Sequence, residues 1–299
     1  MNTTIPETSL QQLHQAIHDN KGMLPGPIAA QVMKDCDLID IGPLMISLLP
    51  FAAAYARVPV SNYPVGAVAL GMPTGSIIPN MYLGANVEFT GEALSFTVHA
   101  EQSATTNAWL NGEQGIQALA ISAAPCGYCR QFLYELSTAQ TLNILLPQQN
   151  SPAPATSPLT VFLPDAFGPQ DLGLQGGLMT PQQNGLTLAS GDPLVQAALT
   201  AANACYAPYT KNFAGIALLT PTNVVYVGQY GENAAYNPSM SPLESAVTFL
   251  NMSQAQGASM VITRAVLVES PTTASQKDVT VSVLSSFAPS VQLEYYAAR

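Results

Sequence analysis

The sequence predicts an α/β protein built from two lobes, with a small helical arm in front of them. Its 299 residues exceed a typical single domain, and an apolar content of 48% can fill more than one core. From about residue 45, helical and extended patterns alternate along the chain. The spacing of several glycines, prolines and glutamates in the first half then recurs in the second half. We therefore expect the second lobe to be a degenerate copy of the first.

The chain divides into four regions. Residues 1–44 form the arm, with helices expected at 9–20 and 27–35 because Gly22 and Pro25 interrupt the pattern between them. Residues 45–148 form the first lobe and residues 189–299 the second. Residues 149–188 are rich in Pro, Gly, Gln and Ser, which predicts a linker at 149–154 and an ordered loop at 163–169.

Within the first lobe, helical and extended patterns predict a mixed sheet flanked by helices. Pro125 suits the first turn of a helix, because the missing N–H costs nothing there. Gly112 follows the last residues of another helical stretch and is typical of a helix end. The expected helices are 50–57, 101–110 and one starting at Pro125; the expected strands are 66–70, 80–88, 95–98 and 117–122.

The second lobe repeats this spacing in a faded form. The recurring pairs are Pro59 with Pro208 and Gly66 with Gly215 at an offset of 149, Gly84 with Gly228 and Glu88 with Glu232 at 144, and Glu101 with Glu244 at 143. In this alignment Pro242 stands where His99 would be, and no Cys-x-x-Cys follows. We therefore expect the second lobe to keep the fold and to lack a metal site.

One constellation in the first lobe carries chemistry. The string His99-Ala100-Glu101 is followed by Cys126-Gly127-Tyr128-Cys129 directly after Pro125. A Cys-x-x-Cys at a helix start places both sulfurs on one face, and an imidazole with two thiolates leaves the fourth zinc position open to water. Zinc lowers the pKa of such a water toward about 7, and Glu101 is placed to accept and return its proton. His-x-Glu followed by Pro-Cys-x-x-Cys is the signature of zinc-dependent deaminases. We expect one Zn²⁺ per chain, held by His99, Cys126 and Cys129.

The cysteines also allow simpler interpretations. A Cys-x-x-Cys alone also occurs in structural zinc sites and in redox pairs. A structural site needs a fourth protein ligand, and the remaining cysteines, Cys36 and Cys205, stand isolated among apolar or small residues. Neither alternative explains the His-x-Glu string. His14 and His18 lie four residues apart without a third ligand, so we interpret them as an exposed helix face.

Several segments together resemble the cytidine deaminases of the long, two-lobed homodimeric type. The motifs, in order, are SNYPVGA at 61–67, GANVEF at 84–89, TVHAEQSA at 97–104, PCGYCRQF at 125–132, LPDAFGP at 163–169 and ENAAYNP at 232–238. The resemblance runs from about residue 45 to the C-terminus. It implies two α/β/α sandwich lobes, a homodimer, and hydrolysis of cytidine and deoxycytidine to uridine and deoxyuridine with release of ammonia, in pyrimidine salvage.

The resemblance also assigns nucleoside-binding roles to five residues. Asn86 and Glu88 match the pair that holds the ribose 3'-hydroxyl. Tyr63 matches an aromatic residue placed against the pyrimidine, where Phe is common. Ala100 matches a residue whose backbone helps to recognise the base. Phe167 matches an aromatic donated by the partner subunit, so the active site is expected to be completed across the dimer.

Composition narrows the range of partners. The chain has 8 Lys plus Arg against 18 Asp plus Glu, a formal charge of −10, whereas nucleic-acid binders need basic surface. Charged residues make up only 9%, which indicates a surface partly covered by another subunit. The N-terminus lacks the pattern of a signal peptide, and the apolar stretch 41–56 contains Pro43 and Pro50. We expect a cytoplasmic protein with no membrane segment, no nucleic-acid partner and no disulfide framework.

Other functions stay open at this stage. A deaminase of a related nucleoside or nucleotide shares the signature, but a nucleotide substrate needs basic residues for its phosphate. Arg57 and Arg130 lie in the first lobe and Lys34 before it, and two of these three stand outside the pocket motifs. A non-enzymatic zinc-stabilised binding protein is opposed by Glu101, the residue that such a protein could most easily lose.

Overall fold

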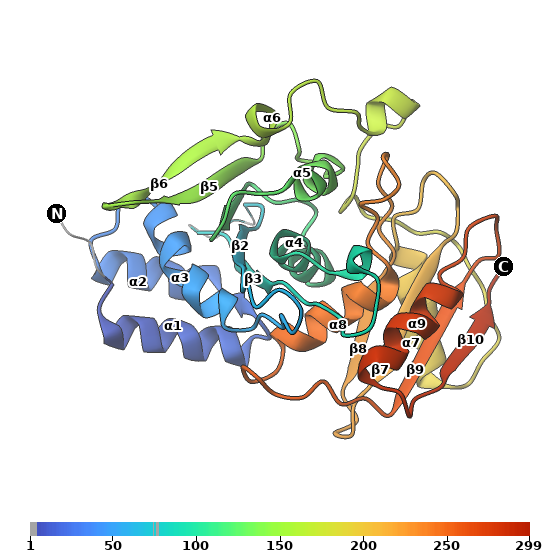
Figure 1. Ribbon diagram of the computed structural model, residues 1–299. Coiled ribbons are helices and arrows are strands. Elements are labelled where there is room, and N and C mark those ends of the chain that lie inside the picture. The colour runs from blue at the N-terminus through green and yellow to red at the C-terminus, as the bar shows by residue number, and fades with distance from the viewer. Residues whose placement is uncertain (1–4, 74, 76–77) are drawn as a thin grey trace.

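The computed structural model describes residues 5–73, 75 and 78–299, which form two sheets, each lying between helices (Figure 1). The first sheet has the strand order β1-β3-β2-β4-β5-β6 and the second has the order β10-β9-β7-β8. The predicted α/β class with two lobes is therefore confirmed. None of the helices described is long and apolar enough to cross a membrane.

The elements of the first lobe extend as far as residue 172. Its strands are β1 (Met23–Leu24), β2 (Gly66–Leu70), β3 (Met81–Ala85), β4 (Ala118–Ile121), β5 (Asn143–Gln148) and β6 (Ser151–Pro158). Its helices are α1 (Glu7–Asp19), α2 (Gly26–Asp35), α3 (Gly42–Ala53), α4 (Ala100–Leu110), α5 (Gly127–Tyr134) and α6 (Leu159–Phe162), with short 3₁₀ turns η1 (Leu94–Phe96) and η2 (Pro169–Leu172). The two helices predicted for the arm are α1 and α2, and β1 between them joins the edge of the sheet next to β3.

The second lobe repeats the topology of the first. It comprises α7 (Pro193–Ala204), β7 (Ala214–Leu219), β8 (Val225–Gln229), α8 (Pro242–Met252), β9 (Arg264–Glu269), α9 (Lys277–Phe287) and β10 (Leu293–Ala297). Strand β7 runs antiparallel to β8 and β9, and β9 runs parallel to β10. The same relations join β2 to β3 and β4, and β4 to β5. Strands β1 and β6 are therefore additions at the two edges of a shared four-strand plan.

Glycines at matching positions let helices approach each sheet. A Cβ on Gly84 would lie 2.1 Å from the Ala104 nitrogen of α4, and one on Gly228 would lie 2.1 Å from the Pro242 oxygen of α8. A side chain at either strand position would thus push the helix away. Helices α4 and α8 lie at the centre of the molecule, between the two sheets (Figure 1).

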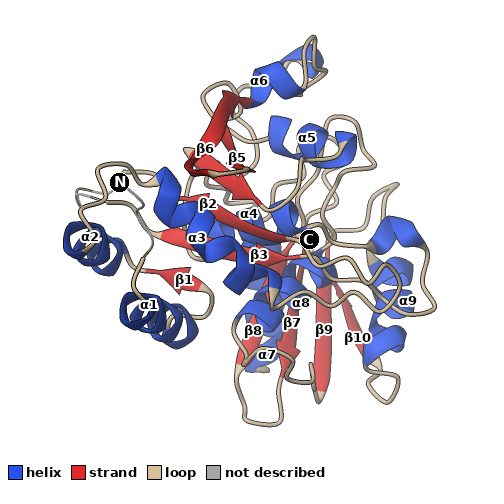
Figure 2. Cartoon of the chain, turned by 60° about the vertical axis from the view of Figure 1, so that its left-hand side comes forward, coloured by secondary structure: helices blue, strands red, loops and turns tan. Residues whose placement is uncertain are grey.

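The two lobes share one apolar core, which extends across α4 and α8. Ala104 and Trp109 of α4 belong to the same buried cluster as Val247 and Leu250 of α8. On the opposite face of the first sheet, α1, α2 and α3 cover a separate cluster, and α7 covers another on the second sheet. Figure 2, turned by 60° from Figure 1, shows the strands of the two sheets with helices around them. This arrangement agrees with the predicted α/β/α lobes.

One helix of the first lobe starts earlier than predicted and contains two prolines. The helix predicted at 50–57 is instead α3, which starts at Gly42, with Pro43 in its first turn and Pro50 inside. An interior proline costs about 3 kcal/mol. Five buried side chains on α3, at roughly 1.5–3 kcal/mol for each large apolar one, outweigh that cost. They are Leu44, Met45, Leu48, Leu49 and Ala52.

Two further expectations about local structure were wrong. The segment at 149–154 is not a linker, because Ser151–Pro158 forms β6 and pairs with β5. A proline-rich strand is possible there because β6 lies at the edge of the sheet, where a missing N–H breaks no ladder on the outer side. The strand expected at 95–98 is the turn η1, and only Val98 forms a bridge, with Val87.

Candidate active site

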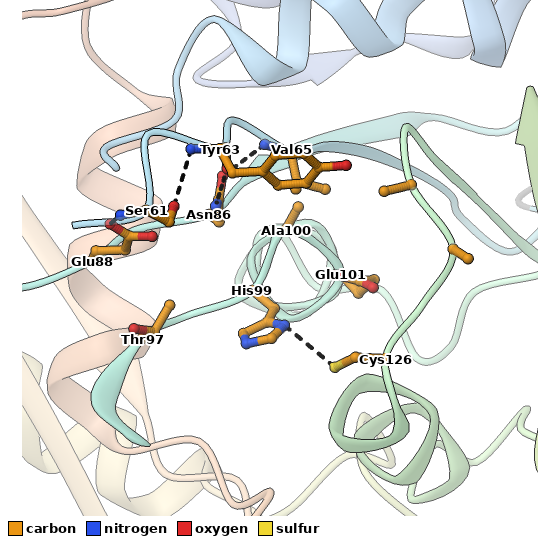
Figure 3. A pocket seen from close by; sticks show the side chains of 12 residues that line it. Ser61, Tyr63, Val65, Asn86, Glu88, Thr97, His99, Ala100, Glu101 and Cys126 are labelled. Carbon is orange, nitrogen blue, oxygen red and sulfur yellow. Dashed lines mark hydrogen bonds between the residues drawn. The ribbon is translucent and has the colours of Figure 1, made fainter. Parts of the chain in front are cut away.

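A cavity of about 260 Å³ opens where β3, α4 and the loop before α5 meet. Its wall comprises the loop before β2, the end of β3, the start of α4 and the loop after β4 (Figure 3). The residues predicted from the sequence that line it are Tyr63, Asn86, Glu88, His99, Ala100, Glu101 and Cys126. Residues from distant segments of the sequence therefore meet at one site.

Two helix N-termini bring the predicted metal ligands together. His99 is the N-cap of α4, and its backbone N–H donates to the Gln102 Oε1 atom at 3.0 Å. Cys126 is the N-cap of α5, and its sulfur accepts from the Cys129 N–H at 3.5 Å. The sequence analysis expected Pro125 in the first turn of this helix. In the structure Pro125 instead precedes the N-cap residue. Both caps hold the ligand residue in extended backbone conformation at the helix end.

The donor atoms of His99, Cys126 and Cys129 are spaced as one metal ion requires. The Cys126 sulfur lies 3.6 Å from the His99 Nδ1 atom, and all three donor atoms lie within 4.8 Å of one another. Tetrahedral zinc bonds of about 2.0–2.3 Å place neighbouring ligand atoms roughly 3.5 Å apart. The donor set and its geometry therefore fit zinc. The described residues contain no second group of this kind.

The electrostatics of the cysteines also favour a cation. A hydrogen bond from Cys129, backbone N–H groups and the nearby His99 lower the pKa of Cys126 to about 5, so this thiol ionises readily. The pKa of Cys129 is raised by its bond to Cys126, by burial and by Glu101. A bound cation deprotonates a coordinating thiol outright. Zinc would thus take the place of the proton that the two sulfurs share.

Glu101 lies beside this cluster and is 4% exposed. Burial raises the pKa of its carboxyl group above the ordinary value, although the nearby His99 and a contact with Cys129 act in the opposite direction. A carboxyl with a raised pKa can both accept and return a proton near neutral pH. The geometry therefore suits Glu101 to general acid and base chemistry.

Asn86 and Glu88 tie the outer wall of the cavity to the end of β3. The Asn86 Oδ1 atom accepts from Val65 N–H at 2.9 Å, and its Nδ2 atom donates to the Tyr63 carbonyl at 3.0 Å. The Glu88 Oε2 atom accepts from the N–H groups of Val60 at 2.8 Å and Ser61 at 3.0 Å. Amide and carboxylate groups have further donor and acceptor capacity, so both side chains can still bind a ligand hydroxyl.

The two predicted aromatic residues lie differently. The Tyr63 ring stands at the mouth of the cavity and is 62% exposed (Figure 3). Phe167 is 47% exposed and is not among the residues that line its own chain's cavity. The Phe167 carbonyl accepts from the Gln131 Nε2 atom at 2.8 Å, which holds its loop on α5. One neighbour was missed by sequence reasoning: Tyr128, between the two cysteines, whose ring centroid lies 5.6 Å from that of His99.

The second lobe corrects one detail of the predicted repeat. Gly228 approaches Pro242 and Ala246 as Gly84 approaches Ala100 and Ala104, which aligns α8 with α4 at an offset of 142. The expected match of Glu101 with Glu244 was therefore wrong by one residue. The matched residues in the two helices are His99 with Ser241, Ala100 with Pro242, Glu101 with Leu243 and Gln102 with Glu244.

Hydrogen bonds confirm this corrected alignment. Gln102 accepts from the N–H of His99, and Glu244 accepts from the N–H of Ser241 at 3.1 Å, each in a capping box. Glu244 therefore caps a helix, as Gln102 does. Leu243 at the position of Glu101 can transfer no proton.

Comparison with known proteins agrees with the site. The model of the cytidine and deoxycytidylate deaminase zinc-binding region matches residues 44–144, and a second model of that description matches residues 159–281. A cytidine deaminase of Aliivibrio fischeri is 43% identical over 92% of this chain and 89% of its own length. One from Photorhabdus laumondii is 43% identical over 93% and 90%.

A solved structure is also similar over part of the chain. The cytidine deaminase from Burkholderia pseudomallei is 29% identical, covers 42% of this chain and 97% of its own, and has a TM-score of 0.35. The identity over nearly the full length of the curated relatives decides membership. The chain belongs to the family of cytidine and deoxycytidylate deaminases with a zinc-binding region.

Proposed function

We propose that this protein hydrolyses cytidine and deoxycytidine to uridine and deoxyuridine, with release of ammonia. The observation that carries the proposal is the placement of Glu101 beside three zinc ligands, inside a cavity whose outer wall presents Asn86 and Glu88. This arrangement supplies a site for the reacting amine and a site for a sugar hydroxyl in one pocket. The expected metabolic role is pyrimidine salvage.

Each residue then has a defined role. Zinc, when bound by His99, Cys126 and Cys129, supplies a water whose pKa is lowered toward about 7. Glu101 would carry two protons in turn: the first from the attacking water to the pyrimidine ring nitrogen, and the second from the hydroxyl added to the ring carbon to the amine, which then leaves as ammonia.

The outer part of the pocket positions the nucleoside. Asn86 and Glu88 bind the ribose 3'-hydroxyl, because an amide and a carboxylate together can both donate and accept. Tyr63 packs on the pyrimidine face, and the Ala100 backbone, at the start of α4, helps to recognise the base. These four roles follow from the family motifs and from the position of each residue on the cavity wall.

A nucleotide substrate is disfavoured by the arginines of the first lobe. The Arg57 guanidinium donates to the Asn251 Oδ1 atom at 2.6 Å and to the Ala258 carbonyl. The Arg130 guanidinium donates to the carbonyls of Pro125 at 2.8 Å and Phe162 at 3.0 Å. Both cations are already used by the fold, so neither is free for a phosphate. We therefore favour nucleosides over their monophosphates.

We also propose a homodimer in which the partner completes each active site. Residues 1–44 would form the arm, 45–148 the catalytic lobe, 149–188 the partner-contacting segment and 189–299 the non-catalytic lobe. Phe167 and Tyr236 are exposed aromatic side chains beside α5, which suits a contact with a second copy. Two of the three zinc ligands are free thiols, so a reducing compartment such as the cytoplasm is the expected location. The acidic balance argues against nucleic-acid partners.

A parallel assay tests the substrate. Purified protein is incubated with cytidine, deoxycytidine, their monophosphates and adenosine, and the loss of absorbance is followed. We expect turnover of the first two only. Preference for a monophosphate or for adenosine would contradict the proposal.

A mixing experiment tests the shared site. Phe167→Ala and Glu101→Gln are each expected to be nearly inactive alone. Heterodimers refolded from the two variants would contain one site with an intact Glu101 and a partner-supplied Phe167, so activity should partly return. Heterodimers verified by mass spectrometry that are no more active than the separate variants would show that Phe167 does not act across the interface.

A further inference from the structure

Glu135 is a buried carboxylate that joins the helix carrying the zinc cysteines to the second lobe. It lies at the end of α5 and is 0% exposed. Its Oε1 atom accepts from the hydroxyls of Tyr206 at 2.8 Å and Tyr209 at 2.6 Å. Its Oε2 atom accepts from the Ala234 N–H at 2.8 Å. The reaction does not use this residue, so its burial and its three bonds need another explanation.

Glu135 is one of three residues on a single face of α5 that hold the segment 231–238. The Tyr128 hydroxyl donates to the Asn237 carbonyl at 3.1 Å, and the Gln131 carbonyl accepts from the Asn233 Nδ2 atom at 2.9 Å. Positions 128, 131 and 135 are three and seven residues apart and share one helical face. The loop between β8 and α8, which contains the segment, extends toward α5 (Figure 1). One face of α5 therefore fixes this segment at three points.

The segment is ordered by its own bonds, yet its tip is uncovered. The Ala235 N–H donates to the Asn233 Oδ1 atom at 2.9 Å, and the Tyr236 N–H donates to the Asn233 carbonyl at 2.8 Å. Tyr236 has a φ of +63°, which is unfavourable for a bulky residue and persists only where the surroundings fix it. Its side chain is nevertheless 65% exposed. No residue of 231–238 lines the cavity of its own chain.

We infer that Glu135 is a positioning residue for nucleoside binding: it locks the segment 231–238, together with the Phe167 loop held by Gln131, in the conformation that closes a partner subunit's pocket. The inference rests on the proposed shared active site. The new point is that the segment 231–238 and the Phe167 loop are held by α5, the helix that carries the zinc cysteines, and not by the second lobe alone. Glu135 touches neither the substrate nor the zinc ligands.

The substitution Glu135→Gln isolates this role. The amide oxygen of the new side chain can still accept from the two tyrosine hydroxyls. Its amino group cannot accept from the Ala234 N–H, which is then left buried without a partner. The lost hydrogen bond destabilises the closed conformation of the segment 231–238. Nucleoside binding then weakens, and KM should rise about tenfold. Zinc content and kcat should stay close to those of the parent, because Cys129 lies at another face of α5.

The primary experiment compares Glu135→Gln with Glu113→Gln. Glu113 is a matched control, because one oxygen accepts from a tyrosine hydroxyl, at 2.9 Å from Tyr82, and the other from the Met72 N–H at 3.0 Å. Both of its contacts lie within the first lobe. We expect Glu135→Gln alone to raise KM about tenfold, with kcat within twofold and about one zinc per chain. Hydrogen exchange of residues 231–238 should become faster in the same variant.

Three results would overturn the inference. An unchanged KM with faster exchange would show that the segment is released without consequence for binding. A loss of zinc, or a fall in kcat at unchanged KM, would show that Glu135 supports the metal helix itself. Equal changes in both variants would also contradict it, since they would report the loss of any buried carboxylate.

Tagged heterodimers separate this inference from the shared-site proposal. A chain with Glu135→Gln is paired with a chain with Glu101→Gln, so the functional pocket belongs to the first chain and the intact Glu135 to the second. A normal KM supports both proposals. A raised KM means that Glu135 acts within its own chain, which removes the shared pocket and keeps the positioning role. An inactive heterodimer would contradict the roles of both residues.

Discussion

The two lobes have one topology, but only the first retains the residues for chemistry. Strands β2, β3, β4 and β5 pair as β7, β8, β9 and β10 do, and glycines at matching positions admit α4 and α8. The differences gather at the helix starts. Gln276 is the N-cap of α9 where Cys126 is the N-cap of α5, and Val279 follows it where Cys129 follows Cys126. The residues that build the sheet and those that bind zinc are therefore largely separate sets.

One carboxylate belongs to both sets. Glu232 accepts from the N–H groups of Tyr209 at 2.8 Å and Thr210 at 3.1 Å, as Glu88 does from Val60 and Ser61. In the second lobe this carboxylate is buried and also accepts from the Thr210 hydroxyl. In the first lobe it lines the cavity. Both lobes therefore use this carboxylate to fix a loop. Only Glu88 can also contact a ligand, because its side chain faces the cavity.

Removal of a zinc thiolate should produce the largest difference between the lobes. Cys129→Ala leaves two protein ligands, so we expect loss of most of the zinc and of measurable activity. Elemental analysis of the parent should give about one zinc per chain, as one His-Cys-Cys site predicts. Cys205→Ala, which removes a buried thiol of the second lobe, is the control and should retain the metal. Two zinc ions per parent chain would show that the second lobe also binds metal.

The second largest loss of activity is expected from replacing Glu101, the proposed general acid and base. Glu101→Gln removes proton transfer but keeps the size of the side chain, so turnover should fall at least about 100-fold with zinc retained. Glu244→Gln makes the same chemical change at a buried carboxylate of the second lobe, which stands at the position of Gln102 and caps α8, and it should leave turnover within about threefold. Activity of Glu101→Gln within tenfold of the parent would rule out the assigned role.

A smaller effect is expected at the shared carboxylate. In Glu88→Gln the amide oxygen can still accept from Val60 and Ser61, but the negative charge facing the sugar is lost. KM should rise roughly tenfold, because hydrogen bonds to charged groups contribute about 1.5–3 kcal/mol. Glu232→Gln alters a carboxylate that faces no substrate in its own chain but lies in the segment 231–238, so it should raise KM less than Glu88→Gln does. Steady-state kinetics measure KM for both variants. An equal change of KM in Glu88→Gln and Glu232→Gln would contradict this comparison.

The sequence predicted the chemistry of the site better than its surroundings. His99, Glu101, Cys126 and Cys129 form a pattern of fixed spacing that few other functions require, and the structure gathers the zinc ligands as expected. The path of α3 through Pro50 was not predictable locally, because burial against the sheet decides it. Strand β6 was missed for a similar reason, since its prolines are tolerated only because it pairs with β5 at the edge of the sheet.

Contacts between residues that are distant in the sequence could not be predicted from local sequence patterns. The match of Glu101 with Glu244 failed by one residue because only the helix caps and glycine contacts reveal the alignment of α8. The role of Glu135 also depends on Tyr206, Tyr209 and Ala234, which lie at least 71 residues away along the chain. No periodicity in α5 indicates such partners.

The smallest effect on activity, and a distinct effect on stability, is expected from Glu244. Burial raises the pKa of its carboxyl to about 7, although bonds from Ser241 lower it, so the folded protein binds this proton more tightly than the unfolded chain does. The resulting stabilisation is complete below the unfolded pKa of about 4.3 and is lost as the pH rises toward 7.

Glu244→Gln removes this titration while its amide oxygen can still cap Ser241. Relative to the variant, the parent should therefore lose stability between about pH 4.3 and pH 7, by up to about 3 kcal/mol. Thermal or denaturant unfolding of both proteins across this range measures the difference. A constant difference in unfolding free energy would mean that Glu244 keeps an ordinary pKa. Glu244 would then cap α8 without a cost of burial, unlike Glu101, whose pKa is raised by burial.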